Sequence, residues 1–214
     1  MRIDRAGVPF IAGALAPGAA CLVARRPAWA LPFAALAGFM AYFFRDPARH
    51  TPAGDHLIVA PADGRVVVAG AADPAAAPPG NWQQVSIFLS PMDVHVNRIP
   101  FSGTIRRVEY RPGKFLPAYR QEAASQNEQS EIWIERDGQT VVARQVVGVL
   151  ARRVVCRVTA GAVVKAGDRF GLMKFGSRMD LFFSPRARLA VAVDDRVVGG
   201  ETVVALLDRP APGQ

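Results

Sequence analysis

Three short polar blocks stand in apolar, strand-like surroundings and contain the residue types that could do chemistry. They are a Gly-Ser pair at residues 176–177, a Pro-Ala-Asp-Gly turn at residues 61–64, and the block Asp-Val-His-Val-Asn-Arg at residues 93–98. Serine, aspartate and histidine together can activate a hydroxyl group. An activated Ser177 hydroxyl can attack the carbonyl of Gly176 within its own backbone. Taken singly each block is commonplace, because Gly-Ser and Asp-Gly pairs are usually turns.

Read together, and behind an apolar N-terminus, these blocks resemble the short bacterial phosphatidylserine decarboxylases. The matching motifs are PADG, DVHVNRIP and FGSR, the last preceded by the strand GDRFG at residues 167–171, and the resemblance extends from about Phe43 to the C-terminus. It implies a pyruvoyl-dependent lyase that converts phosphatidylserine to phosphatidylethanolamine in phospholipid biosynthesis. It also implies a proenzyme that cuts itself between Gly176 and Ser177. The chains of residues 1–176 and 177–214 then stay associated, and a homo-oligomer is left open.

The self-cleavage that the resemblance implies is an N-to-O acyl shift at Gly176-Ser177. Attack by the Ser177 hydroxyl turns the peptide bond into an ester, and elimination leaves dehydroalanine, which hydrolyses to a pyruvoyl group at residue 177. Glycine on the acyl side tolerates strained backbone angles. The reaction needs a base and donors for the oxyanion. We expect His95, oriented by Asp63, to be that base.

One departure from the family pattern concerns the histidine block. Longer members carry a second histidine, associated with self-cleavage, at the position that is Arg98 here. His95 therefore serves decarboxylation, maturation or both, and we expect a shared role. His50 or His56 would supply a missing base only if folding brought one of them close.

In the decarboxylation, the pyruvoyl carbonyl would condense with the headgroup amine and act as an electron sink formed from the chain itself. A neutral His95 would return the proton to the α-carbon. The lipid phosphate needs a cation, and Arg98 and Arg178 are the candidates because guanidinium binds phosphate bidentately. We expect no metal, because the three histidines have no ligand partners at close spacing.

Three other functions compete with this interpretation. Leu172-Met173-Lys174-Phe175 faintly resembles the hairpin of biotinyl and lipoyl carriers, with Lys174 as the attachment site. A carrier, however, has no need of PADG or DVHVNR. A membrane adaptor without chemistry would be indifferent to Ser177, and a decarboxylase of a related serine-headgroup lipid would need the same residues.

Charge and cysteine content favour a lipid-associated protein of a reducing compartment. The formal net charge is +8, which suits nucleic acid or anionic lipid. The sequence shows no zinc spacing, helix-turn-helix pattern or aromatic RNA-binding strand. Cys21 and Cys156 lie in apolar surroundings and predict no disulfide.

Residues 1–45 are predicted to associate with a membrane. Two apolar runs, about 6–24 and 28–44, flank Arg25-Arg26-Pro27, and each approaches the ~20 residues that cross a bilayer. A signal peptide is the competing interpretation, but the second apolar run argues against it. Prolines in both runs leave a re-entrant hairpin open. We expect the cell inner membrane, with the catalytic domain on the cytoplasmic side.

Residues 46–214 are predicted to form one mainly β catalytic domain, an antiparallel barrel-sandwich with few helices behind the N-terminal hydrophobic helical hairpin. Short runs rich in β-branched residues, punctuated by Gly, Pro and Asp, indicate the strands, and Asp137-Gly138 predicts a hairpin. In the small chain, the runs 181–183 and 188–193 are expected to join the same sheet as the large chain. No βαβ alternation is present, which argues against a parallel sheet.

Overall fold

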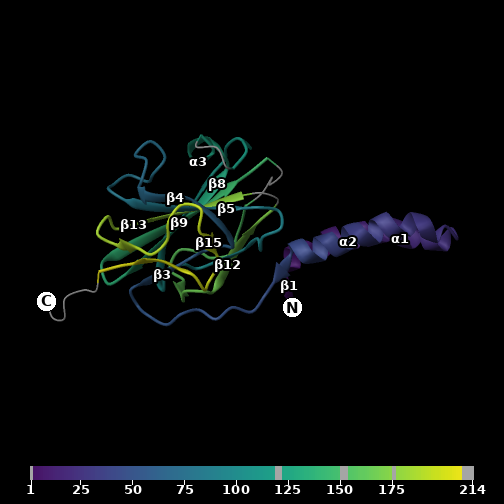
Figure 1. Ribbon diagram of the computed structural model, residues 1–214, viewed down its shortest axis with the longest axis horizontal. Coiled ribbons are helices and arrows are strands. Elements are labelled where there is room, and N and C mark those ends of the chain that lie inside the picture. The colour runs from purple at the N-terminus through teal and green to yellow at the C-terminus, as the bar shows by residue number, and fades with distance from the viewer. Residues whose placement is uncertain (1, 119–121, 150–153, 175–176, 209–214) are drawn as a thin grey trace. The chain divides into compact units, whose positions relative to one another are not determined.

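The chain forms two compact units, residues 1–48 and 49–214. The computed structural model describes residues 2–118, 122–149, 154–174 and 177–208 (Figure 1). Gly176, on the acyl side of the predicted cleavage site, lies outside the described residues. Each unit is a structural body of its own.

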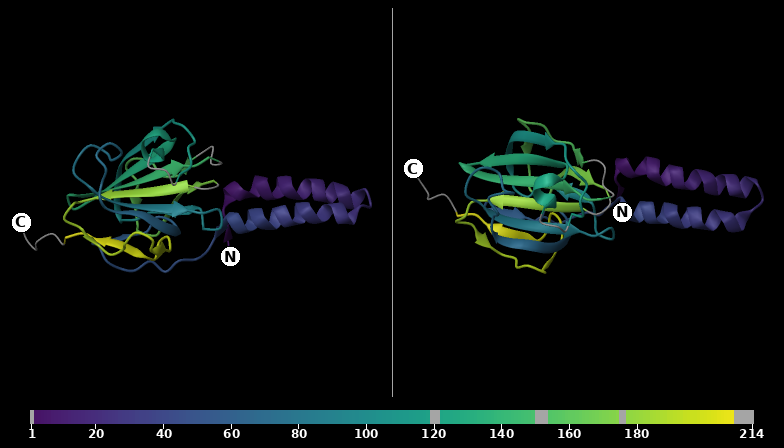
Figure 2. Two further views of the ribbon diagram at one scale, coloured as in Figure 1. Left: turned by 45° about the horizontal axis from the view of Figure 1, so that its top comes forward. Right: turned by 90° about the horizontal axis from the view of Figure 1, so that it is seen from above.

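The first unit is the predicted hydrophobic helical hairpin. Helix α1 (Val8–Val23) and helix α2 (Leu31–Phe43) run side by side (Figure 2), each preceded by a 3-10 turn, and β1 (Arg2–Ile3) pairs antiparallel with β2 (Arg45–Asp46). Pro9 and Pro32 occupy the first turns of the helices, where a missing N–H costs nothing. The prolines therefore begin the helices, and only Pro17 lies inside one.

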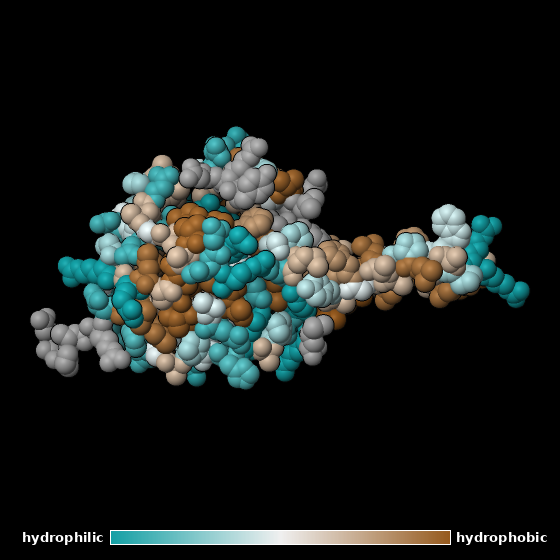
Figure 3. All heavy atoms as spheres, viewed as in Figure 1, coloured by the Kyte–Doolittle hydropathy of each residue, from teal (hydrophilic) through white to brown (hydrophobic). Residues whose placement is uncertain are grey.

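Apolar side chains cover most of the exposed surface of this hairpin, with hydrophilic residues at the turn between the helices (Figure 3). The segment Arg5–Val23 is long and apolar enough to cross a membrane, whereas the apolar segment Pro27–Phe43 is shorter. Leu15 and Leu22 are more than 40% exposed. Such an exposed apolar surface is compatible with membrane association.

The second unit is mainly β and antiparallel, as predicted. Its large sheet has the order β11-β7-β8-β9-β13-β5-β4-β15 and curls around the core (Figure 2). In chain order these strands are β4 (Gly64–Ala71), β5 (Gln83–Leu89), β7 (Gly103–Arg111), β8 (Gln129–Arg136), β9 (Gln139–Val147), β11 (Val163–Val164), β13 (Ser177–Phe183) and β15 (Arg196–Val197).

Two three-stranded sheets complete the unit. One joins β10 (Val154–Cys156), β12 (Arg169–Met173) and β6 (Val96–Arg98), and the other joins β14 (Arg188–Leu189), β16 (Val203–Leu206) and β3 (Leu57–Val59). The short helix α3 (Ala123–Gln126) precedes β8 in the chain. The prediction that the run 188–193 joins the same sheet as 181–183 is wrong, because β14 contains two residues and pairs with β16.

Local sequence explains the hairpin between β8 and β9. Asp137 and Gly138 have φ angles of 50° and 74°, and Arg136 pairs with Gln139 across the turn. Two successive positive φ angles define the turn type whose twist matches antiparallel strands, and Asp-Gly is one of its preferred pairs. This hairpin confirms the prediction made from the two residues.

Strand β13 is the central element of the unit. It pairs antiparallel with β5 on one side and with β9 on the other, and all seven of its residues are buried. Met179, Leu181 and Phe183 point into the hydrophobic core. The intervening Arg178, Asp180 and Phe182 face the opposite side of the sheet, where they are buried as well.

Candidate active site

Ser177 begins β13 and lies between Leu89 of β5 and Val147 of β9. Its side chain shares a face with Met179, on the core side, and the residue is fully buried. Its Oγ has no hydrogen-bond partner among the described residues. A buried hydroxyl without a partner costs about 1–3 kcal/mol, so a native structure retains one only where something else requires it.

His95 is brought to the same end of the sheet by two short connections. Strand β6 pairs with β12, and the Met173 N–H donates to the His95 carbonyl at 3.3 Å. Residues 174–176 connect Met173 to Ser177, and residues 90–94 connect Leu89, the partner of Ser177, to His95. The sequence-predicted base and nucleophile are therefore confined to one end of unit 2.

The imidazole of His95 is fully buried and oriented by a backbone carbonyl. Its Nδ1 lies 3.0 Å from the carbonyl oxygen of Asp93. A carbonyl can only accept, so Nδ1 carries the proton and Nε2 is the nitrogen that accepts one in the neutral ring. The Asp93 carboxylate accepts from the Ser90 N–H at 2.8 Å and from Arg196 at 3.1 Å, which fixes this loop.

Asp63 lies in the turn between β3 and β4 and has different partners from those expected. Its carboxylate accepts from Arg49 Nη2 at 2.8 and 2.7 Å and from the Gly199 N–H at 2.8 Å. Across the described parts of the chain, none of its hydrogen bonds comes from His95. The orienting contact that we expected Asp63 to make with His95 is made by the Asp93 carbonyl.

The block around Asp63 nevertheless meets the histidine block. The Arg98 N–H donates to the Pro61 carbonyl at 2.8 Å, which joins the turn to β6. Gly64 packs against β5 so closely that a Cβ there would lie 2.2 Å from the Phe88 carbonyl oxygen. Phe88 in turn pairs with Arg178. The glycine of PADG is thus required by close backbone packing next to the strand that carries Ser177.

The two candidate phosphate ligands are both buried. Arg98 Nη1 donates to the Gly167 carbonyl at 3.0 Å. Arg178 donates from Nε to Asp180 Oδ1 at 2.5 Å and from Nη2 to Ser86 Oγ at 2.9 Å. It faces the side of β13 opposite to Ser177 and forms a buried ion pair there with Asp180.

Two buried side-chain amides near Ser177, those of Gln145 and Asn97, were not predicted from the sequence as site residues. Gln145 is paired with Met179 on the face of the sheet that Ser177 shares, and its Nε2 donates to Asn97 Oδ1 at 2.8 Å and to the Val155 carbonyl at 3.4 Å. The carbonyl fixes the Gln145 amide, and Gln145 then fixes Asn97. Asn97 Nδ2 is left as a buried donor with no acceptor in the described structure. Asn97 follows His95 by two residues, and in extended chain such residues lie on the same side. This spacing could have indicated from the sequence that Asn97 lies near the site.

In the described parts of the chain, the strands on either side of Lys174 do not form the hairpin of a biotinyl or lipoyl carrier. This residue follows β12, which pairs with β10 and β6, whereas β13 belongs to the large sheet. Carriers display their lysine at the tip of a paired hairpin, and these two strands do not pair. Among the described residues, no group of three or more His, Cys, Asp or Glu side chains could hold a metal ion.

A cavity of about 510 Å³ lies at the other end of the large sheet, beside the hairpin that joins β8 and β9. Asp55 and Arg136 line it, and the Arg136 guanidinium donates a hydrogen bond to Asp55 that lowers the pKa of this carboxyl. Gln139, which also lines it, is at the opposite end of β9 from Val147. The cavity is therefore separate from the Ser177 site.

The fold and the site define a small antiparallel β protein in which a buried serine and an oriented histidine share one end of the sheet. The family model for phosphatidylserine decarboxylase matches residues 36–205. A phosphatidylserine decarboxylase proenzyme of Solibacter usitatus is 42% identical over 210 residues, covering 98% of this chain and 99% of the relative. Those of Gluconacetobacter diazotrophicus and Nitrosomonas europaea are 44% and 42% identical over at least 93% of this chain and 92% of each relative. The chain belongs to the phosphatidylserine decarboxylase family.

We predict that Arg178→Ala destabilises the fold. Removing the arginine leaves Asp180 buried and charged, and such a change costs about 3–5 kcal/mol. Urea unfolding of the full chain measures this free energy. Arg65→Ala is the matched control, because the Arg65–Asp194 pair is exposed and such a pair contributes at most about 1 kcal/mol. Unchanged unfolding with a raised KM for phosphatidylserine would instead assign Arg178 to the lipid phosphate.

Proposed function

We propose that the protein decarboxylates phosphatidylserine to phosphatidylethanolamine in phospholipid biosynthesis, after cutting itself between Gly176 and Ser177. The observation that carries the proposal is the buried Ser177 hydroxyl, which has no hydrogen-bond partner among the described residues and lies at the end of the sheet to which His95 is confined. The relatives are named proenzymes, which supports processing of the chain. The family match supports this headgroup over a related serine lipid, and a decarboxylase over a carrier.

Maturation begins at the Ser177 hydroxyl. His95 Nε2 accepts the hydroxyl proton as Oγ attacks the Gly176 carbonyl carbon. Collapse of the tetrahedral oxyanion then breaks the peptide C–N bond, His95 returns the proton to the leaving nitrogen, and an ester with a free amine at residue 177 remains. Loss of the Ser177 α-proton then expels the Gly176 carboxylate, which frees residues 1–176. Hydrolysis of the resulting dehydroalanine releases ammonia and leaves a pyruvoyl group on residues 177–214. No metal takes part in these steps.

The residues around Ser177 fit such a group. The site is buried, and it contains a donor, Asn97 Nδ2, without an acceptor among the described residues. The pyruvoyl carbonyl supplies an electron sink as carbon dioxide leaves. Once the group has formed, Asn97 Nδ2 would donate to a carbonyl oxygen, and His95 would deliver the proton that replaces the carboxylate on the α-carbon. Fixed donors in a buried site stabilise charge better than water does.

The large and small chains remain associated after the cut, without a disulfide. Strand β13 belongs to the small chain and lies between β5 and β9 of the large chain. Its Leu181, Phe182 and Phe183 are fully buried. Burial of such side chains stabilises by ~1.5–3 kcal/mol each, which outweighs the loss of one covalent link.

The protein acts at the cell inner membrane, with the catalytic unit on the cytoplasmic side. The apolar segment Arg5–Val23 supports membrane association. The net charge of +8 supports contact with anionic lipid. Substrate and protein are then held on the same surface.

Self-cleavage is tested by intact mass spectrometry of the purified protein. We expect two chains, residues 1–176 and 177–214, the second resistant to Edman degradation because a pyruvoyl group has no amine. Ser177→Ala should stay whole and release no carbon dioxide, and Ser177→Cys should cut slowly because a thiol can make the same acyl shift. A wild-type protein that is fully active as one uncut chain would refute the proposal.

The division of work between His95 and Asp63 follows from their contacts. We expect His95→Ala to accumulate precursor because it removes the base. Asp63→Asn should slow cutting less, because Asp63 holds Arg49 and Gly199 rather than the imidazole. A cleavage gel, carbon dioxide release from labelled phosphatidylserine and a melting curve are measured for each. If Asp63→Asn blocks cutting as completely as His95→Ala without lowering the melting temperature, both residues belong to one relay.

Asn97→Asp tests the role of the Asn97 Nδ2 donor separately from that of Oδ1, which accepts from Gln145. The substitution keeps an oxygen to accept from Gln145 and replaces the open Nδ2 donor by an acceptor. We expect cutting or turnover to fall by about 10²–10³-fold, the usual effect of losing one such donor. Gln145→Glu, which alters the supporting amide, is the companion variant. Wild-type rates of both steps in folded Asn97→Asp would restrict Asn97 to a packing role.

A further inference from the structure

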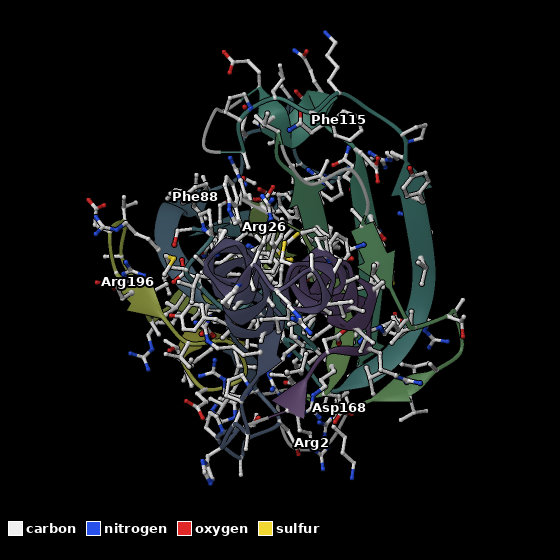
Figure 4. All side chains as sticks on the ribbon, turned by 90° about the vertical axis from the view of Figure 1, so that its right-hand side faces the viewer. Arg2, Arg26, Phe88, Phe115, Asp168 and Arg196 are labelled. Atoms are coloured by element: carbon white, nitrogen blue, oxygen red, sulfur yellow. The ribbon has the colours of Figure 1, made fainter. Side chains whose placement is uncertain are left out.

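Two exposed apolar side chains lie at the Ser177 end of the large sheet. Phe115, in the segment after β7, is 41% exposed, and Val149, just after β9, is 54% exposed. Phe115 is labelled in Figure 4 on the same end of unit 2 as Phe88. Single exposed apolar residues are normal on protein surfaces, so their meaning depends on whether these two lie together.

A buried asparagine fixes the two segments to each other. Asn127 Nδ2 donates to the carbonyls of Leu116 and Val147, both at 2.8 Å, and its Oδ1 accepts from the Leu116 N–H at 2.9 Å. Asn127 is 1% exposed. Phe115 is next to Leu116, and Val149 is two residues beyond Val147, so one amide holds both apolar side chains in the same neighbourhood.

The same contacts connect this neighbourhood to the active site. Val147 is the β9 partner of Ser177. On the other side of Ser177, the connection from Leu89 to His95 carries Met92, which is 56% exposed. Exposed apolar side chains on separate segments therefore follow Leu89 and Val147, the two strand partners of Ser177, closely in the chain.

The charge beside these side chains is positive. Lys114 is exposed, and its ammonium donates to the neutral amide of Gln126 at 3.1 Å. Among the described residues it forms no ion pair with a carboxylate. Apolar side chains with an uncompensated cation beside them are the combination that binds an anionic lipid surface, because the apolar groups insert and the cation meets the headgroups.

We propose that Phe115, Val149 and Lys114, which we call the docking rim, insert into an anionic lipid surface beside the Ser177 site. The docking rim holds the active-site end of the catalytic unit at headgroup depth, so that a serine headgroup reaches Ser177 without the lipid leaving the bilayer. The inference rests on the proposed function, since it takes the substrate to be a membrane lipid. A second copy of the chain is the other occupant that such a surface could take.

The test compares two physical forms of the substrate. The full chain, as purified wild type, Phe115→Asp and Val149→Asp, is assayed on vesicles of phosphatidylserine and phosphatidylglycerol and on short-chain phosphatidylserine dissolved as monomers. We expect both variants to lose about tenfold or more in turnover on vesicles, because a charge at the interface opposes insertion. Turnover of the monomeric lipid should stay within about twofold, because no atom of the site has changed.

Val163→Asp is the matched control. Val163 is 82% exposed and pairs with Thr104, at the opposite end of the large sheet. It should leave both activities unchanged. Lys114→Glu should lose activity on anionic vesicles and regain it on vesicles in which phosphatidylcholine replaces the phosphatidylglycerol. Melting temperatures show that each variant is folded.

The results of these assays distinguish a failure of the docking rim from a failure of the proposed decarboxylase function. Wild-type turnover on vesicles by both rim variants overturns the docking rim and leaves the decarboxylase intact. Equal losses on vesicles and monomers also overturn it, since the residues then act on the site itself. Light scattering that shows an oligomer dissociated by Val149→Asp assigns the surface to a second copy. A cut wild-type protein that decarboxylates neither form refutes the proposed function, and the docking rim with it.

Discussion

The pairing of β13 between β5 and β9 is the constraint on which the rest of the structure depends. It buries both faces of the strand and places Ser177 at the first paired position, with its hydroxyl on the core side. A one-residue shift in register would exchange the two faces and put Arg178 in the position of the serine. The buried pair of Arg178 with Asp180 on the other face opposes such a shift, because it would have to enter the hydrophobic core.

Around this strand, backbone carbonyls determine how the polar side chains point. The Asp93 carbonyl fixes the tautomer of His95, and the Val155 carbonyl fixes Gln145 and, through it, Asn97. A carbonyl that belongs to the fold does not titrate or rotate as a side chain does. The site can therefore hold a basic nitrogen and an open donor in set directions, which is the preorganisation that favours charged transition states.

Local patterns predicted the parts of this fold that depend on near neighbours. The β-branched runs predicted β5, β8 and β9, and Asp137-Gly138 predicted the hairpin between the last two. Strand β7 was not predicted, since its Arg106, Arg107 and Glu109 read as a polar segment. They lie beyond Gly103 and Thr104, the two residues of β7 that pair with β11, and the Arg107 guanidinium lies over the ring of Trp133. The three motifs identified the family and the residues of interest.

Contacts between residues far apart in the chain could not be predicted from the sequence. Nothing local indicates that Asp63 pairs with Arg49, which lies in none of the motifs, or that Gln145 supports Asn97 across two sheets. Arg178 follows the serine directly and looks like a substrate ligand in the sequence. Strand alternation places it on the far face, a consequence that requires knowing where β13 begins. The motifs identify candidate residues, whereas the register of the sheet determines which of these residues lie on the same face and can contact one another.

We propose that residue 177 becomes the reacting group and that the surrounding site brings the amine of the lipid headgroup to it. The most direct measurement is reductive trapping, in which the protein turns over phosphatidylserine with a labelled headgroup in the presence of cyanoborohydride. Mass spectrometry then locates the label. The account predicts a covalent adduct on the N-terminal residue of the chain 177–214, absent from Ser177→Ala. An adduct on Lys174, or decarboxylation with no adduct on residue 177, would contradict it.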